Sequence, residues 1–142
     1  MINNNVLDMI GNTPMIKLNN IGNSNIYVKL EKYNPAGSIK DRAVYYMVEN
    51  LEKNGLLKKG DVLVEATSGN TGIALSMIGS LKGYKVIIVM PETMSVERRT
   101  LMKAYGAKLI LTDGSLGMKG SIEMMNKLLS ENTNYISLKQ FE

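Results

Sequence analysis

The sequence contains no cysteine, no histidine and no tryptophan, and it has only one phenylalanine. The absence of cysteine excludes disulfides, thiolate nucleophiles and thiolate metal sites. The absence of histidine excludes Ser–His and Cys–His nucleophile pairs, and it also excludes imidazole metal ligands. A reactive nucleophile or base in this chain must therefore be a side chain of another kind.

Long apolar runs and clusters of like charge are also absent. The longest apolar stretches are far too short to span a bilayer, and the opening MINNNVLDMIGN lacks the basic start and apolar core of a signal peptide. The net charge is +4, from 17 basic and 13 acidic residues, and the basic residues are scattered along the chain. We therefore expect a cytoplasmic protein that binds neither membranes nor nucleic acid, with anionic small molecules as the remaining candidate partners.

The length and the pattern of apolar residues are ordinary for one globular domain. The chain has 142 residues, of which 44% are hydrophobic and 21% are charged. From residue 61 onward, short continuous apolar runs alternate with segments of helical spacing. The predicted strands are residues 13–18, 26–30, 61–66, 85–90, 108–112 and 135–138. The predicted helices are a segment that starts near Ser38 and ends before Gly55, and residues 73–81, 95–105 and 117–130.

This alternation predicts an α/β fold, with a parallel sheet that has helices on both faces. Parallel strands need crossover helices, and strands buried on both sides carry continuous apolar residues. Residues 26–30 alternate apolar and polar side chains instead, so we expect that strand to be half-buried or near a sheet edge.

Residues 34–42, NPAGSIKDR, place a lysine where a helix is predicted to start. Ser38 and Asp41 match a capping box, in which the serine caps the first turn and the acidic residue reaches back. Lys40 would then lie in the first turn, where the helix dipole disfavours a cation by roughly 0.3–1 kcal/mol. That is too little to neutralise a lysine without desolvation or a covalent imine. From these residues alone, an exposed lysine that points into water is the alternative.

Residues 67–72, TSGNTG, connect a predicted strand to a predicted helix. Ligands of open α/β sheets bind at the carboxyl ends of the strands, and the N–H groups of a helix start favour an anion. The spacing does not distinguish phosphate from carboxylate, and a turn that only caps itself is also consistent with it. The chain has neither G-x-x-x-x-G-K-[ST] nor G-x-G-x-x-G, so no nucleotide site is predicted.

Several stretches resemble the fold-type II pyridoxal-phosphate enzymes, which have a tryptophan synthase β-like fold. NPAGSIKDR resembles their lysine motif, and TSGNTG resembles their substrate-carboxylate loop. Residues 83–122 are similar to the cysteine synthase (O-acetylserine sulfhydrylase) family, and residues 10–19 and the closing Gln140-Phe141 fit the same family. The cystathionine β-synthases share the first two motifs, so their type of β-replacement stays an alternative.

The resemblance implies a β-replacement that converts O-acetylserine and sulfide to cysteine and acetate. Lys40 would hold the cofactor, pyridoxal 5'-phosphate, through its amine and then act as the base at the substrate α-carbon. Asn70 would also contact the ring hydroxyl of the cofactor, and no metal is implied. The residues implied to bind the substrate carboxylate are Thr67, Ser68, Asn70, Thr71 and Gln140. Full-length members form homodimers and can bind serine acetyltransferase, which is thereby a candidate partner.

The sequence departs from the family pattern in its length. The loop that binds the cofactor phosphate and the residue that pairs with the pyridine nitrogen belong to a half of the pattern that is missing from it. Residues 1–40 would be strands of an incomplete large domain, and residues 41–142 a small α/β domain that carries the carboxylate loop. We expect a truncated fold with low stability or self-association and little activity alone. The alternatives are a non-catalytic module that binds an amino acid or a partner, and a truncated gene product without function.

Overall fold

The computed structural model describes residues 3–21 and 25–139. In chain order, the helices and strands are β1 (Met15–Leu18), β2 (Ile26–Lys29), α1 (Lys40–Lys53), β3 (Val62–Ala66), α2 (Asn70–Leu81), β4 (Lys85–Pro91), α3 (Val96–Ala104), β5 (Lys108–Thr112), α4 (Gly117–Glu131) and β6 (Tyr135–Ile136). Short 3₁₀ helices cover Val6–Met9, Glu31–Tyr33 and Gly114–Leu116. Among the described residues, no helix has both the length and the apolar character that crossing a membrane requires.

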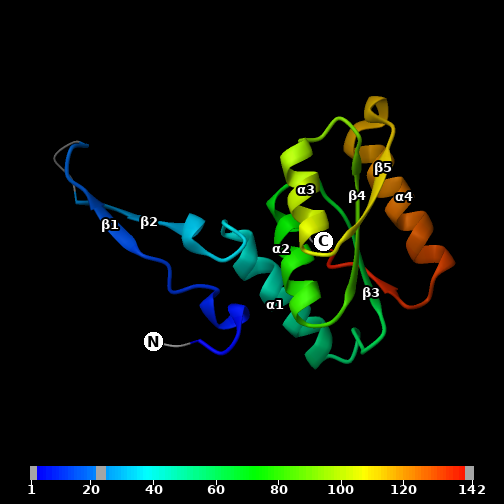
Figure 1. Cartoon of the computed structure of the whole chain (residues 1–142), viewed down its shortest axis with the longest axis horizontal. Coiled ribbons are helices and arrows are strands. Elements are labelled where there is room, and N and C mark those ends of the chain that lie inside the picture. Colours follow the sequence, from blue (N-terminus) through cyan, green and yellow to red (C-terminus); the bar gives the residue numbers. More distant parts are fainter. Residues whose placement is uncertain (1–2, 22–24, 140–142) are drawn as a thin grey trace.

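Four of the strands form a parallel sheet in the order β5-β4-β3-β6. Nearly every residue of β3 and β4 is buried, as expected for parallel strands that are covered on both sides. Figure 1 shows α1, α2 and α3 on one face of this sheet and α4 on the other. The predicted α/β fold, with a parallel sheet between two layers of helices, is confirmed.

Each face of the sheet has its own apolar core. On the side of α1, α2 and α3, the fully buried residues include Val44, Ile78 and Met102. On the opposite side, Val64 and Val89 pack with partly buried apolar residues of α4. The close approach of α2 to β4 requires a glycine, because a Cβ at Gly79 would overlap the Val86 side chain. These contacts fix the direction in which α2 leaves the sheet.

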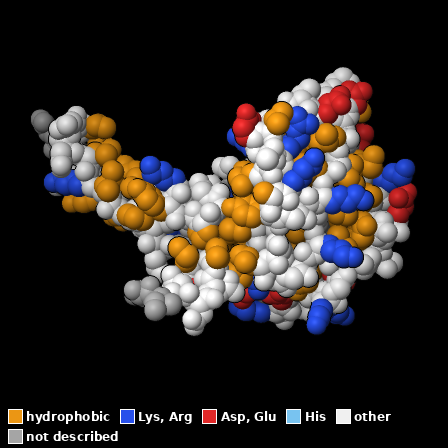
Figure 2. Space-filling view, viewed as in Figure 1, with side chains coloured by type: hydrophobic (Ala, Val, Ile, Leu, Met, Phe, Trp, Pro, Cys, Tyr) orange, Lys and Arg blue, Asp and Glu red, His pale blue; other side chains and the backbone are white. Residues whose placement is uncertain are grey.

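The two N-terminal strands form a separate antiparallel ribbon, in which Ile16 pairs with Val28. The ribbon projects away from the parallel sheet (Figure 1), and apolar side chains lie on its visible surface (Figure 2). Along β2 the side chains alternate between partly buried and exposed, as the sequence predicts. Met15, Ile16 and Tyr27 are all exposed. The ribbon therefore has little apolar burial of its own.

Most predicted boundaries agree with the structure, but those at the carboxyl end of the sheet do not. α2 begins at Asn70 rather than residue 73, so half of TSGNTG belongs to the helix. The strand predicted over residues 85–90 extends one residue further, to Pro91, which pairs with Thr112. β6 ends at Ile136 rather than residue 138, because the next residues bind the Glu65 side chain and not a backbone ladder.

Candidate active site

Lys40 is the first residue of α1, and its side chain is exposed. Its predicted place in the first turn is confirmed, and the predicted capping residues Ser38 and Asp41 both bind backbone N–H groups of the turn, although the assigned N-cap lies one residue after Ser38. The N-cap residue is Ile39, which makes no side-chain cap, and Ser38 Oγ accepts a hydrogen bond from the Lys40 N–H at 3.1 Å. The Asp41 carboxylate reaches further back than a box requires and accepts from the Ala36 N–H at 2.6 Å.

Asp41 is fully buried beneath the turn that carries Lys40. Burial raises the pKa of its carboxyl group, and the backbone N–H groups of Ala36 and Ser38 act in the opposite direction. Oδ2 holds the Ala36 N–H, whereas Oδ1 has no hydrogen-bond partner within the described part of the chain. The carboxylate thus connects Ala36 with Asp41 and holds the turn between them in place.

A second carboxylate, that of Glu31, connects α1 to the β1–β2 ribbon. Arg42 donates to it from Nε at 2.8 Å and from Nη2 at 3.0 Å, which is a two-point ion pair. Thr13 Oγ1 donates to the same carboxylate at 2.7 Å, and Asn34 Nδ2 donates at 2.9 Å. These partners, Arg42 foremost, lower the pKa of Glu31 from 4.5 to about 2. We call Thr13, Glu31, Asn34 and Arg42 the Glu31 cluster.

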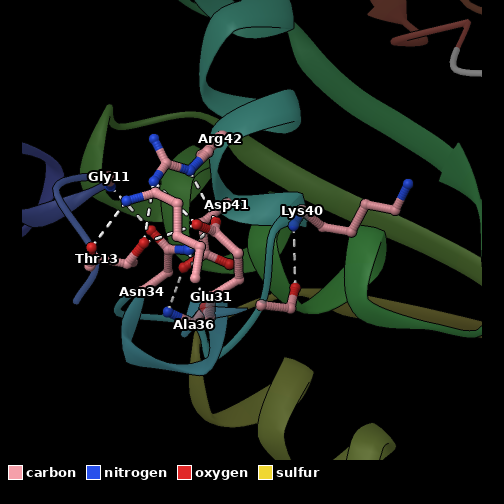
Figure 3. A network of polar contacts seen from close by, with 10 residues as sticks. Gly11, Thr13, Glu31, Asn34, Ala36, Lys40, Asp41 and Arg42 are labelled. Carbon is pink, nitrogen blue, oxygen red and sulfur yellow. Dashed lines mark hydrogen bonds and ion pairs between the residues drawn. The ribbon is translucent and has the colours of Figure 1, made fainter. Parts of the chain in front are cut away.

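The Glu31 cluster also holds the chain near Gly11. Asn34 Oδ1 accepts from the Gly11 N–H at 2.8 Å. Gly11 has a φ of +89°, and a Cβ there would lie 2.9 Å from Arg42 Nη1, so this position favours glycine on both counts. Figure 3 shows the Lys40 side chain extending away from the cluster. Within the described residues, the Lys40 amine has no hydrogen-bond or ion-pair partner, so the cluster holds the backbone and leaves the amine available.

Four of the five predicted carboxylate-binding residues lie where β3 leads into α2. Thr67 follows β3, Ser68 and Gly69 form the turn, and Asn70 and Thr71 begin the helix. The N-cap residue Gly69 offers no side-chain cap. Among the described residues, the N–H groups of Ser68, Asn70 and Thr71 have no backbone acceptor. A helix start of this kind favours an anion.

The opposite ends of α1 and α2 show how Lys40 and this loop are related. Lys82, directly after α2, forms ion pairs with Glu49 at 2.5 Å and Glu52 at 2.7 Å, both near the end of α1. The two packed helices therefore run in the same direction, as Figure 1 also shows. Their first residues, Lys40 and Asn70, consequently lie at the same end of the pair, which is the carboxyl end of the parallel strands.

Sequence reasoning missed several residues that shape this region. Arg98 of α3 donates to the Ser68 carbonyl at 3.3 Å and brings a positive charge to the loop. Asn34 and Arg42 lie at the two ends of NPAGSIKDR, but their contacts with Gly11 and Glu31 depend on the tertiary fold. Glu65, which binds the residues after β6, could have been recognised from the sequence because it is a charged residue within an otherwise apolar strand. Gln140, the last predicted carboxylate ligand, lies outside the described residues.

Known proteins that resemble the chain do so over almost all of it. Residues 6–142 match the family model described as pyridoxal-phosphate dependent enzyme. A cysteine synthase of Flavobacterium sp. is 53% identical over 140 residues, which are 97% of this chain and 46% of that protein.

Two solved structures have the same fold and cover a similar share of the chain. A cysteine synthase of Entamoeba histolytica has a TM-score of 0.95 and 47% identity, over 99% of this chain and 44% of that one. A hydrogen sulfide-producing enzyme of Fusobacterium nucleatum has a TM-score of 0.93 and 52% identity, over 99% of this chain and 47% of that one. The chain spans less than half the length of these relatives.

Proposed function

The chain belongs to the family of pyridoxal-phosphate dependent enzymes, and we propose that it is the N-terminal half of a cysteine synthase. The proposed reaction replaces the acetate of O-acetylserine with sulfide and yields cysteine. One observation carries the proposal: a lysine amine that has no partner among the described residues and a helix start without a side-chain cap lie at the same end of two parallel helices. Relatives that match almost the whole chain are cysteine synthases.

The chemistry of the described residues fits part of pyridoxal phosphate. The exposed Lys40 amine suits attachment of the cofactor aldehyde, and the exposed Asn70 amide suits its ring hydroxyl. We assign no residue to the cofactor phosphate, which would be bound by the part of the relatives that the chain does not span. When bound, the cofactor withdraws electrons from the substrate α-carbon.

The proposed roles of the protein groups follow from their positions. The N–H groups of Asn70 and Thr71, with the hydroxyl groups of Thr67 and Ser68, would bind the substrate carboxylate, and Gln140 would complete this grip. Lys40 Nζ would then take the proton from the substrate α-carbon. Because the turn at Lys40 is fastened at both ends, its side chain can move while its backbone stays in place, and such orientation contributes strongly to rate.

Domain division and partners complete the proposal. Residues 1–40 would belong to a large domain and residues 41–142 to a small one, which is supported by the separation of the β1–β2 ribbon from the parallel sheet. We propose a homodimer for the complete protein. A terminal carboxylate of serine acetyltransferase would suit the same loop as the substrate, because both present a carboxylate to one helix start.

The test uses this chain together with the complementary C-terminal portion of the Flavobacterium cysteine synthase. We expect cysteine formation from O-acetylserine and sulfide, and we expect Lys40→Ala to reduce it at least about a hundredfold because the base is lost. Lys103→Ala, which changes an exposed lysine of α3, is the control and should retain activity. Undiminished activity of Lys40→Ala would contradict the proposal.

The same combination of the two chains distinguishes cysteine synthesis from the alternative functions. Turnover of serine with homocysteine, without turnover of O-acetylserine, would indicate a cystathionine β-synthase type of reaction. Calorimetric binding of an amino acid without any turnover would indicate a non-catalytic remnant.

A further inference from the structure

Glu65 is a charged residue inside the buried strand β3, whose other residues are Val62, Leu63, Val64 and Ala66. Its side chain is 2% exposed. A buried carboxylate is unfavourable unless hydrogen-bond donors surround it, and an apolar residue would serve the core better. A glutamate at this position therefore requires a reason other than packing.

The carboxylate binds the segment that follows β6. Glu65 Oε2 accepts from Ser137 Oγ and from the Leu138 N–H, both at 3.0 Å. Ser137 Oγ in turn accepts from the Lys139 N–H at 3.1 Å. Lys139 has a φ of +55°, so the chain turns there, directly before Gln140. Three consecutive residues are thus connected to one buried carboxylate.

The Glu65 carboxylate binds the chain directly after the last backbone pairing between β3 and β6. β3 and β6 pair only at Val62–Tyr135 and Leu63–Ile136. Continued at the same offset, the ladder would place Leu138 beside Glu65, and there the Leu138 N–H binds the side chain instead of a backbone carbonyl. Together with the Leu138 side chain, which is buried in the core, the carboxylate directs the continuation of the short edge strand β6.

We propose that Glu65 is a positioning residue that fixes residues 137–139 against the end of β3 and so orients the segment that leads to Gln140, a proposed ligand of the substrate carboxylate. Glu65 lies two residues before Thr67, and its partner Leu138 lies two residues before Gln140. One side chain thereby joins the two segments that lead to the proposed substrate ligands. The inference rests on the proposed function, because the roles of Thr67 and Gln140 do.

The first experiment measures the connection itself by amide hydrogen exchange on the 142-residue chain. Glu65→Leu and Glu65→Gln are both uncharged and of similar size, but only glutamine can accept a hydrogen bond. Relative to amides of β4, we expect exchange at Leu138 to accelerate about tenfold in Glu65→Leu and to change less than about threefold in Glu65→Gln. Ser137→Ala, which removes one donor and leaves the core intact, should give an intermediate increase.

Ser121→Ala is the matched control, because it removes the buried hydrogen bond between Thr112 and Ser121, 2.7 Å long, from another part of the sheet. It should not accelerate exchange at Leu138 selectively. Unchanged exchange at Leu138 in both Glu65→Leu and Ser137→Ala would overturn the proposal.

The second experiment measures position and is independent of any cofactor or activity. The chain has no cysteine, so Ser68→Cys with Gln140→Cys gives one pair whose disulfide formation reports the approach of the two segments. We expect rapid cross-linking with Glu65, about tenfold slower cross-linking with Glu65→Leu, and rescue by Glu65→Gln. Equal rates in all three backgrounds, or no cross-link with Glu65, would overturn the positioning role even if the enzyme proposal holds.

Discussion

At the residue scale, the candidate site is organised by carboxylates that bind the chain on either side of Lys40. Asp41 binds Ala36 from beneath the turn, and Glu31, which directly follows the ribbon, binds Arg42. Neither carboxylate forms an ion pair with the lysine in the described structure. A lysine that must bond covalently to a cofactor benefits from this arrangement, because an ion pair would favour the charged, unreactive amine.

The pH dependence of stability tests the Glu31 cluster. The pKa of Glu31 falls from 4.5 to about 2 on folding. Its contribution to stability is therefore fully present above pH 4.5 and is lost as the pH falls through about 2. We expect Glu31→Gln to be less stable than the wild type at neutral pH and to lose less stability between these two pH values.

Urea unfolding at a series of pH values measures this difference. Glu123→Gln, at an exposed position of α4 outside the cluster, is the control and should keep the wild-type pH dependence. Identical pH dependence of Glu31→Gln and wild type would show that the cluster contributes nothing to folding.

Single residues of the site were predictable only where they are contiguous in sequence. Lys40 and the loop from Thr67 to Thr71 belong to short motifs with a physical signature, namely a helix start or a strand-to-helix turn. The Glu31 cluster joins residues up to 29 positions apart, between Thr13 and Arg42. Contacts over such separations depend on the tertiary fold, which spacing within one motif does not encode.

At the element scale, the sequence pattern predicted which segments are helices and strands better than it predicted their ends at the site. Apolar periodicity depends on the core and identifies β3, β4 and α4 well. The ends depend instead on local polar contacts. β6 stops early because a side chain replaces its backbone partner. The start of α2 was predicted too late because no side-chain cap marks the beginning of the helix.

The ribbon of β1 and β2 is the element pair that we expect to cause self-association. Side chains alternate between its faces, so Ile16 and Leu18 share one face with their partners Val28 and Ile26. Both strands also keep one edge outside any sheet in the described structure. We expect the isolated chain to associate with increasing concentration, and Ile16→Lys to shift it toward the monomer in sedimentation velocity.

Leu56→Lys is the matched control, because Leu56 is 60% exposed but lies after α1 and far from the ribbon in sequence. It should associate like the wild type. A wild-type chain that stays monomeric at all concentrations, or an equal effect of both substitutions, would argue against the ribbon as the surface through which the chain self-associates.

At the scale of the whole molecule, the parallel sheet and the β1–β2 ribbon differ in how much of their apolar surface is buried. The parallel sheet is covered on both faces and has a core on each side. The ribbon, by contrast, exposes apolar side chains and joins the rest through the Glu31 cluster. The chain matches less than half of its relatives, which agrees with the proposal that the ribbon belongs to a domain whose remaining strands lie in the other half.

The most direct test of this interpretation is the location of covalently bound pyridoxal. The 142-residue chain is saturated with pyridoxal phosphate, reduced with borohydride and mapped by peptide mass spectrometry. We expect one dominant label, on Lys40, and its disappearance in Lys40→Ala without a new site replacing it. Labelling spread evenly over the surface lysines, or a dominant label on another lysine, would contradict the assignment of Lys40 and with it the proposed function.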